Sequence, residues 1–196
     1  MPEPTVPAPG EAAGTGEAPG GTAAGDMASG PVDLTAVQGL LAAWWFAYDQ
    51  ADVDAWPGFF TADAHFACRS DTGRAPYEDF IRADVTGRDA VLAWQTDHRR
   101  QSPYPLRHSA TNVHVVAARP GEADFRSYLV VTHIVGGAVA NLSTGVCTGT
   151  ARAEGGAVRL ADLRVVLDTT DSVPYAEVER RRATVSDDQP RPRAGA

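Results

Sequence analysis

The chain has 196 residues, which is enough for one domain with a sizeable core. All 17 basic side chains are arginine, and 25 acidic side chains give a formal net charge of −8, so no nucleic-acid partner is expected. Two cysteines, Cys68 and Cys147, are too few for a disulfide framework or a zinc site.

A membrane partner is not expected either. No stretch is long and apolar enough to span a bilayer, and the N-terminus lacks the charged-then-apolar pattern of a signal peptide. We therefore expect a cytoplasmic protein.

Both ends of the chain have the composition of disordered tails. Residues 1–31 and 186–196 are rich in proline, glycine and alanine and offer almost nothing to bury. The folded domain is expected to span residues 32–185.

The first predicted element is an amphipathic helix. Apolar residues recur along it at three- and four-residue spacing: Leu34, Val37, Leu41, Trp44 and Tyr48. Thr35 followed by Gln38 could form a capping box, and Asp33 is the alternative cap. Asp49 follows the aromatic stripe directly, so its carboxylate either lies in water at the rim or points into a pocket.

Shorter elements are expected between the first helix and Pro105. Asp52 is expected to cap a short helix that runs to Phe60, and residues 63–69 read as a short strand. Residues 76–85 and 87–100 predict two further helices with a break near Thr86–Gly87.

After Pro105 the residue pattern predicts strands in place of helices. Four segments rich in threonine and valine, 106–118, 123–135, 139–153 and 157–168, are separated by glycine-containing turns. Helices followed by a run of antiparallel strands predict an α+β domain, here a cone-shaped α+β barrel whose curved antiparallel sheet is wrapped by the N-terminal helices. Residues 174–185 predict a final helix.

Alternation along two neighbouring strands places polar residues inside the cone. His108, Ala110 and Asn112 share one face of the first long strand. On the next strand, His133 ends an apolar inner face that includes Leu129 and Val131. Two histidines could therefore point into one cavity, although a lone strand histidine is more often structural, and Asp52 and Asp54 compete with Asp49.

The order of these motifs resembles the nuclear transport factor 2-like superfamily. The motifs are Tyr48-Asp49 on the first helix, "FFTADA", "GRDAVLAW", "RHSATNV" and three more strands. Within that superfamily the chain is similar to the SnoaL-like polyketide cyclases and dehydratases, and to scytalone dehydratase in particular. The resemblance covers about Leu34 to Asp168.

The resemblance implies an acid–base site with four catalytic residues. Tyr48 and Asp49 match the family's helix pair, and His108 and His133 match its two strand histidines. Asp49 would fix the tautomer of His108, the base that removes a proton next to a carbonyl. His133 would hold the departing hydroxyl, and Tyr48 would polarise the carbonyl.

Two departures from the family pattern shape the expected pocket. Cys68 stands where the dehydratase has a second tyrosine, and Cys147 stands where it has an asparagine. The less polar pocket favours a larger or more apolar polyketide-type molecule. The residues expected to contact it are Trp45, Cys68, Asn112, Leu129, Val131 and Cys147.

The leading interpretation is a cofactor-independent enzyme of secondary metabolism, without a metal, that dehydrates, cyclises or isomerises a polyketide-like hydroxy-carbonyl compound. An aldol closure could use the same groups. Epoxide opening is a weaker alternative, because relatives that open epoxides use paired carboxylates with an arginine. A noncatalytic domain, like the β-subunit of a ring-hydroxylating dioxygenase, is the alternative from another class. A homodimer or homotrimer through the outer sheet face is expected.

Overall fold

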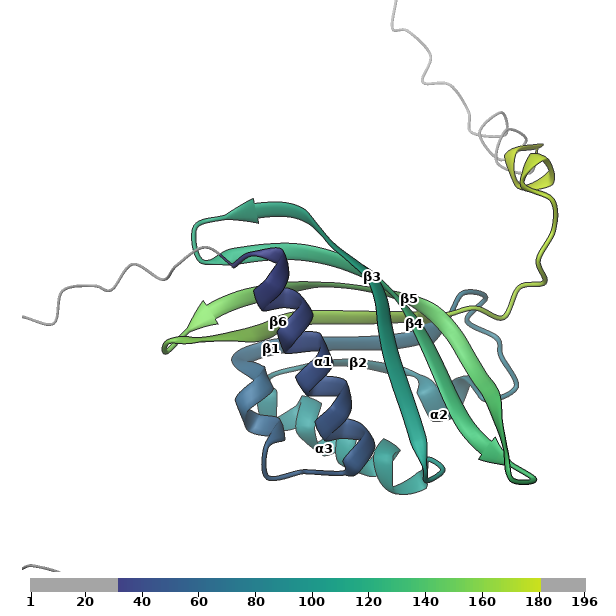
Figure 1. Ribbon diagram of the computed structural model, residues 1–196, viewed down its shortest axis with the longest axis horizontal. Coiled ribbons are helices and arrows are strands. Elements are labelled where there is room, and N and C mark those ends of the chain that lie inside the picture. The colour runs from purple at the N-terminus through teal and green to yellow at the C-terminus, as the bar shows by residue number, and fades with distance from the viewer. Residues whose placement is uncertain (1–31, 181–196) are drawn as a thin grey trace, which may run out of the picture.

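The computed structural model describes residues 32–180, in which six strands form one curved sheet with helices packed on its concave side (Figure 1). The elements in chain order are α1 (Leu34–Gln50), the 3-10 helix η1 (Trp56–Phe59), β1 (Phe60–Ser70), α2 (Glu78–Ile81), β2 (Ala83–Thr86), α3 (Arg88–Gln101), β3 (Leu106–Arg119), β4 (Glu122–Val135), β5 (Ala138–Glu154) and β6 (Ala157–Leu167).

The sheet is mixed and open. Its strand order is β2-β1-β6-β5-β4-β3, and β3 to β6 form the expected antiparallel run. The α+β prediction is confirmed, but β1 pairs in parallel with β6, and the two edge strands do not meet to close a barrel. Helix α1 lies against β3, and α3 lies against β1.

Helix α1 forms as its apolar spacing predicts, and Asp33 caps it. The backbone N–H of Ala36 donates to Asp33 Oδ1 at 2.8 Å, so the alternative cap is the one used. Trp44 is fully buried, and its ring contacts the rings of Trp56 and Phe60. This aromatic cluster fixes the helix on the sheet, and the helix ends at Ala51 in the left-handed conformation.

The segment between α1 and α3 differs from its prediction. The expected helix from Asp52 is only the four-residue turn η1, whose N-cap is Ala55 without a side-chain cap. The strand expected at 63–69 begins earlier, at Phe60.

The helix predicted at 76–85 is one turn, α2, followed by the unpredicted edge strand β2. The Glu78 carboxylate accepts hydrogen bonds from the backbone N–H groups of Ser70 and Ala75 and ties the start of α2 to the end of β1. The helix ends because the backbone of Arg82 is extended and leads into β2.

A bulge in β3 changes which side chains face inward. Asn112 has a φ of 53°, and the pairing with β4 shifts register between Thr111 and His114. Beyond the bulge, Val113 and Val115 pack against the core, whereas Asn112 is exposed. The prediction that Asn112 points into the cone is therefore wrong, because strict alternation ends at the bulge.

Glycine allows β5 and β6 to approach closely at Gly149. A Cβ atom on Gly149 would lie 2.2 Å from the Asp162 carbonyl oxygen and 2.8 Å from Phe125 Cζ. Only glycine fits there, and Phe125 is thereby buried beneath the strand.

The predicted final helix is described in part, since residues 175–180 are helical. Its remainder and both predicted tails lie outside the described residues. Within residues 32–180, no helix combines the length and the apolar character that crossing a bilayer requires.

Candidate functional site

A cavity of about 280 Å³ lies between the concave face of the sheet and the helices. Aromatic residues form much of its wall: Trp45, Phe66, Tyr77, Phe80 and Trp94. The polar side chains in the wall are few: Tyr48, Gln95, His98, Ser102, His108 and Ser143. Among the residues described, no aspartate, glutamate or arginine lines it, so the site suits an uncharged, largely apolar ligand.

His108, one of the lining residues, forms a buried pair with Asp49, which does not itself line the cavity. His108 Nδ1 lies 2.6 Å from Asp49 Oδ1, and the backbone N–H of His108 donates to Asp49 Oδ2 at 2.8 Å. The two side chains are 5 % and 9 % exposed. A carboxylate beside Nδ1 favours the proton on that nitrogen and leaves Nε2 as a base. No residue of the described chain bonds Nε2.

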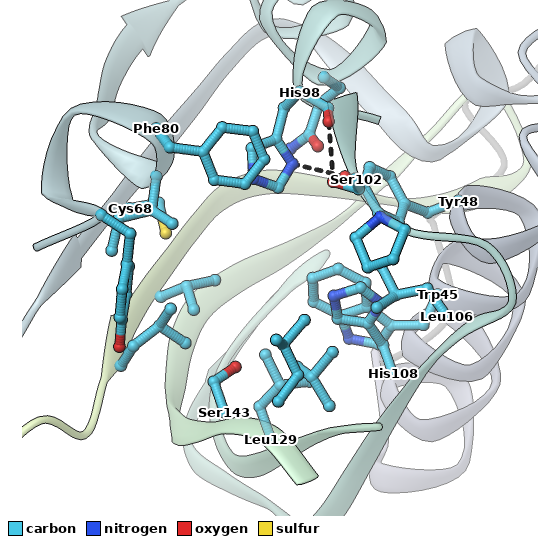
Figure 2. A pocket seen from close by; sticks show the side chains of 18 of the residues that line it. Trp45, Tyr48, Cys68, Phe80, His98, Ser102, Leu106, His108, Leu129 and Ser143 are labelled. Carbon is cyan, nitrogen blue, oxygen red and sulfur yellow. Dashed lines mark hydrogen bonds between the residues drawn. The ribbon is translucent and has the colours of Figure 1, made fainter. Parts of the chain in front are cut away.

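Two aromatic rings hold the His108 imidazole in place. The Trp45 ring is stacked on it, with 4.5 Å between centroids and 9° between planes, as Figure 2 shows. The Tyr48 ring meets it edge-on at 5.3 Å. The imidazole plane is therefore fixed by Asp49, Trp45 and Tyr48 together.

Tyr48 contacts a second histidine, His98, which lies on α3. The Tyr48 hydroxyl lies 2.6 Å from His98 Nδ1, and the His98 ring is stacked on the Phe80 ring (Figure 2). The Trp94 ring is also stacked on it. Burial, with smaller contributions from the neighbouring His108 and Arg99, lowers the pKa of His98 to about 4. Burial raises the pKa of the Tyr48 phenol. Both groups are therefore uncharged at neutral pH.

Arg99 fixes the backbone that carries Tyr48 and Asp49. Its buried guanidinium donates to the carbonyl oxygens of Tyr48 at 3.0 Å and Asp49 at 2.8 Å, and to that of Pro103 at 3.2 Å. A cation at the carboxyl end of α1 also interacts favourably with the helix dipole. The end of α1 is thus held against the end of α3.

The structure brings most of the predicted residues together. Asp49 and His108 are bonded, and the cavity wall includes Trp45, Tyr48, Cys68, His108, Leu129 and Val131. Burial raises the pKa of the Cys68 thiol to about 12, so the thiol remains protonated. The catalytic and binding roles of these residues stay predictions.

Three predicted residues are not in the cavity wall. His133 lies opposite Leu106 on β3, on the face that His108 shares, but it is half-buried beyond the last lining residues of β4. Cys147 is fully buried behind the wall. Asn112 borders a separate groove between α1 and β3.

Sequence reasoning missed His98, Gln95 and Arg99, which all lie on α3. A signal was present, because Trp94 and His98, and likewise Gln95 and Arg99, are four residues apart and share a helix face. Only the packing of α3 on the end of α1 shows that these polar side chains face inward. Within residues 32–180, no three histidine, cysteine or acidic side chains are grouped as a metal site.

The match to known sequences is at the level of a family. Residues 32–164 match the model of the SnoaL-like domain. The chain belongs to the SnoaL-like family. No curated protein sequence matches it.

Solved structures similar to this SnoaL-like chain share its fold at low sequence identity. A nuclear transport factor 2-like protein with a cystatin-like fold from Novosphingobium aromaticivorans has 20 % identity and a TM-score of 0.56, with 74 % of this chain and 87 % of that chain covered. A candidate scytalone dehydratase from the same organism has 14 % identity and a TM-score of 0.54, with coverages of 71 % and 87 %.

The β-subunit of the benzoate 1,2-dioxygenase from Burkholderia mallei has 21 % identity and a TM-score of 0.53, with 69 % of this chain and 90 % of that chain covered. The neighbours therefore include an enzyme-like protein and a subunit of a larger assembly. They establish the cone-type α+β fold, and function has to be argued from the site.

Proposed function

We propose that this SnoaL-like protein is an acid–base enzyme that removes water from an uncharged, polyketide-like hydroxy-carbonyl compound without a cofactor. The observation that carries the proposal is the buried carboxylate of Asp49, which holds His108 by Nδ1 and leaves Nε2 free in a cavity wall. Deprotonation next to a carbonyl needs such an oriented base.

The first step is proton transfer from carbon to His108. Nε2 takes the proton from the carbon beside the carbonyl, and the electron pair of the broken C–H bond forms the enolate double bond. Negative charge develops on the carbonyl oxygen, where the Tyr48 phenol donates a hydrogen bond. The Asp49 carboxylate stabilises the imidazolium that forms.

The second step expels water. The enolate re-forms the carbonyl, the new C=C bond forms, and the C–O bond to the β-hydroxyl breaks. The leaving hydroxyl takes the proton from the His108 imidazolium, which returns the site to its starting state. One histidine serves as base and then as acid, so the proton and the hydroxyl leave from the same face.

The cavity supports the substrate class. Its aromatic wall and volume of about 280 Å³ suit a compact ring system, and its uncharged lining offers no counter-ion for a carboxylate or a phosphate. Aldol ring closure would begin with the same deprotonation, so it is the alternative reaction for this site.

The test uses 4-hydroxy-2-tetralone, which loses water to give fluorescent 2-naphthol. His108→Phe keeps an aromatic ring on Trp45 and the backbone bond to Asp49 but has no base, so its rate should fall about 100-fold or more. The rate of Asp49→Asn should fall by a similar factor, because the neutral amide does not stabilise the imidazolium as the carboxylate does.

The matched controls are His114→Phe, an exposed histidine on the same strand, and Asp52→Asn, an exposed acid after α1. Both should keep the wild-type rate. Wild-type activity in His108→Phe would contradict the mechanism. No acceleration by the wild-type protein would favour the noncatalytic alternative.

A further inference from the structure

We infer that His98 is a positioning residue for Tyr48. Its Nδ1–H donates to the phenol oxygen, so that the phenol hydrogen is directed at the oxygen of the bound carbonyl compound. The inference rests on the proposed function, because it assigns a further residue to the same reaction. It replaces the expected second strand histidine with a residue from α3.

The geometry ties His98 to Tyr48 and to the cavity at once. The two side chains are 2.6 Å apart and both line the cavity. Phe80 stacks on the His98 ring at 4.5 Å and Trp94 at 4.7 Å, so the imidazole has little freedom to turn away. The backbone below Tyr48 is held by Arg99 from the adjacent position of α3.

The hydrogen bonds of His98 differ from those of His65, which is a structural histidine. His65 uses both ring nitrogens, with Nδ1 at 2.6 Å from Asp162 and Nε2 at 2.8 Å from Asp84, and so bridges three strands. His98 has one bonded nitrogen, no carboxylate partner and, in the described part of the chain, nothing bonded to Nε2. A cavity-lining ring with an unused nitrogen is suited to a ligand.

The direction of the hydrogen bond follows from what the enolate needs. If the phenol donated to His98, its hydrogen would be used, and the developing oxyanion would face an oxygen lone pair. When Nδ1–H donates instead, the phenol hydrogen stays available for a bound carbonyl oxygen, which takes the place of Ser102, the other side-chain partner of the phenol. Charge that builds up on the phenol oxygen as it shares this hydrogen is then stabilised by the imidazole. Nε2 is left as an acceptor for a substrate hydroxyl.

The first measurement needs no substrate. A long-range ¹H–¹⁵N NMR spectrum of the ¹⁵N-labelled protein at pH 7, assigned with His98→Phe, reports which nitrogen of His98 carries the proton. The Nδ1–H tautomer is expected. The Nε2–H tautomer would overturn the inference, whatever the activity of the protein.

The second measurement follows deuterium exchange at the α-carbon of 2-tetralone in D₂O by NMR. His98→Phe keeps the stacked ring but has no nitrogen, and we expect its exchange rate to fall about tenfold or more with little change in KM. His98→Asn retains a donor near the Nδ1 position and should recover most of the rate.

A double-mutant cycle then tests whether His98 acts through Tyr48. In a Tyr48→Phe background, His98→Phe should have no further effect. An unchanged rate in the single variant, an equally slow His98→Asn, or a full additional loss in the double variant would each overturn the inference. Failure of the proposed function looks different, because His108→Phe would then exchange 2-tetralone as fast as the wild type.

Discussion

Arg99 should be the most sensitive single position for stability outside the hydrophobic core. The side chain is buried, and its guanidinium donates to four backbone carbonyls at the junction of α1, α3 and the following loop, the one of Ser102 at only 3.5 Å. Arg99→Met keeps the length of the aliphatic chain and removes all of these bonds. This substitution therefore tests whether the junction of α1 and α3 stabilises the backbone that carries Tyr48 and Asp49.

The magnitude can be worked from the bonds. A hydrogen bond to a charged group contributes about 1.5–3 kcal/mol net. The Tyr48 carbonyl keeps a second donor, the backbone N–H of Ala51 at 3.0 Å, so its loss is partial. The carbonyls of Asp49 and Pro103 lose more hydrogen-bond free energy than the Tyr48 carbonyl does. We expect a total loss of about 3–4 kcal/mol in the free energy of unfolding.

Urea unfolding followed by tryptophan fluorescence measures this loss, with Arg100→Met as the matched control, because Arg100 is the next residue and is exposed. The 2-tetralone exchange rate should fall as well in the folded Arg99→Met protein, since Tyr48 and Asp49 share the loosened backbone. A loss within about 0.5 kcal/mol of that in Arg100→Met would refute the reasoning.

Three further outcomes are expected. The carboxylates of Asp84 and Asp162 raise the pKa of His65, so the stabilisation from this histidine is complete below pH 6.5 and is lost as the pH rises through the raised folded pKa. Urea unfolding of the wild type across pH 6–9 should show this decline in the free energy of unfolding. A His65→Gln variant with the same decline would contradict the assignment. Gly149→Ala should lower the free energy of unfolding by about 2 kcal/mol or more, because its Cβ would overlap the Asp162 carbonyl; Gly39→Ala on α1, where the space is open, is the control and should not destabilise. Tyr128 faces outward between the buried Ser127 and Leu129 and is 57 % exposed, so Tyr128→Glu should convert the proposed homodimer or homotrimer to monomers in light scattering; an unchanged mass would locate the interface elsewhere or show that there is none.

Local pattern accounts for the elements that sequence reasoning found. The aromatic stripe of α1, the Asp33 cap and the long β-branched segments after Pro105 each determine their own secondary structure. Strand β2 was not predicted, because the four residues Ala83–Thr86 show no periodicity of their own and form a strand only by pairing with β1. The parallel pairing of β1 with β6 joins segments about 100 residues apart, which no local signal contains.

The site was predictable where residue types match a family motif and not where packing decides. Asp49 and His108 were located through the resemblance, and they are bonded in the structure. Asn112 was misplaced because one bulge residue reverses the alternation on which the prediction depended. His98 has no motif, and its contact with Tyr48 spans 50 positions in the chain.

Hydrogen-bond partners distinguish the histidines better than residue type or position. His65 has two carboxylate partners and bridges three strands, which is the arrangement of a structural residue. His108 and His98 each commit Nδ1 to one partner, Asp49 or Tyr48, and each keeps Nε2 for the cavity they line. Burial lowers the pKa of His98 and keeps it uncharged at neutral pH, whereas His108 has the Asp49 carboxylate beside Nδ1. Two imidazoles on one cavity with different partners, a carboxylate and a phenol, suit a division between base and hydrogen-bond donor.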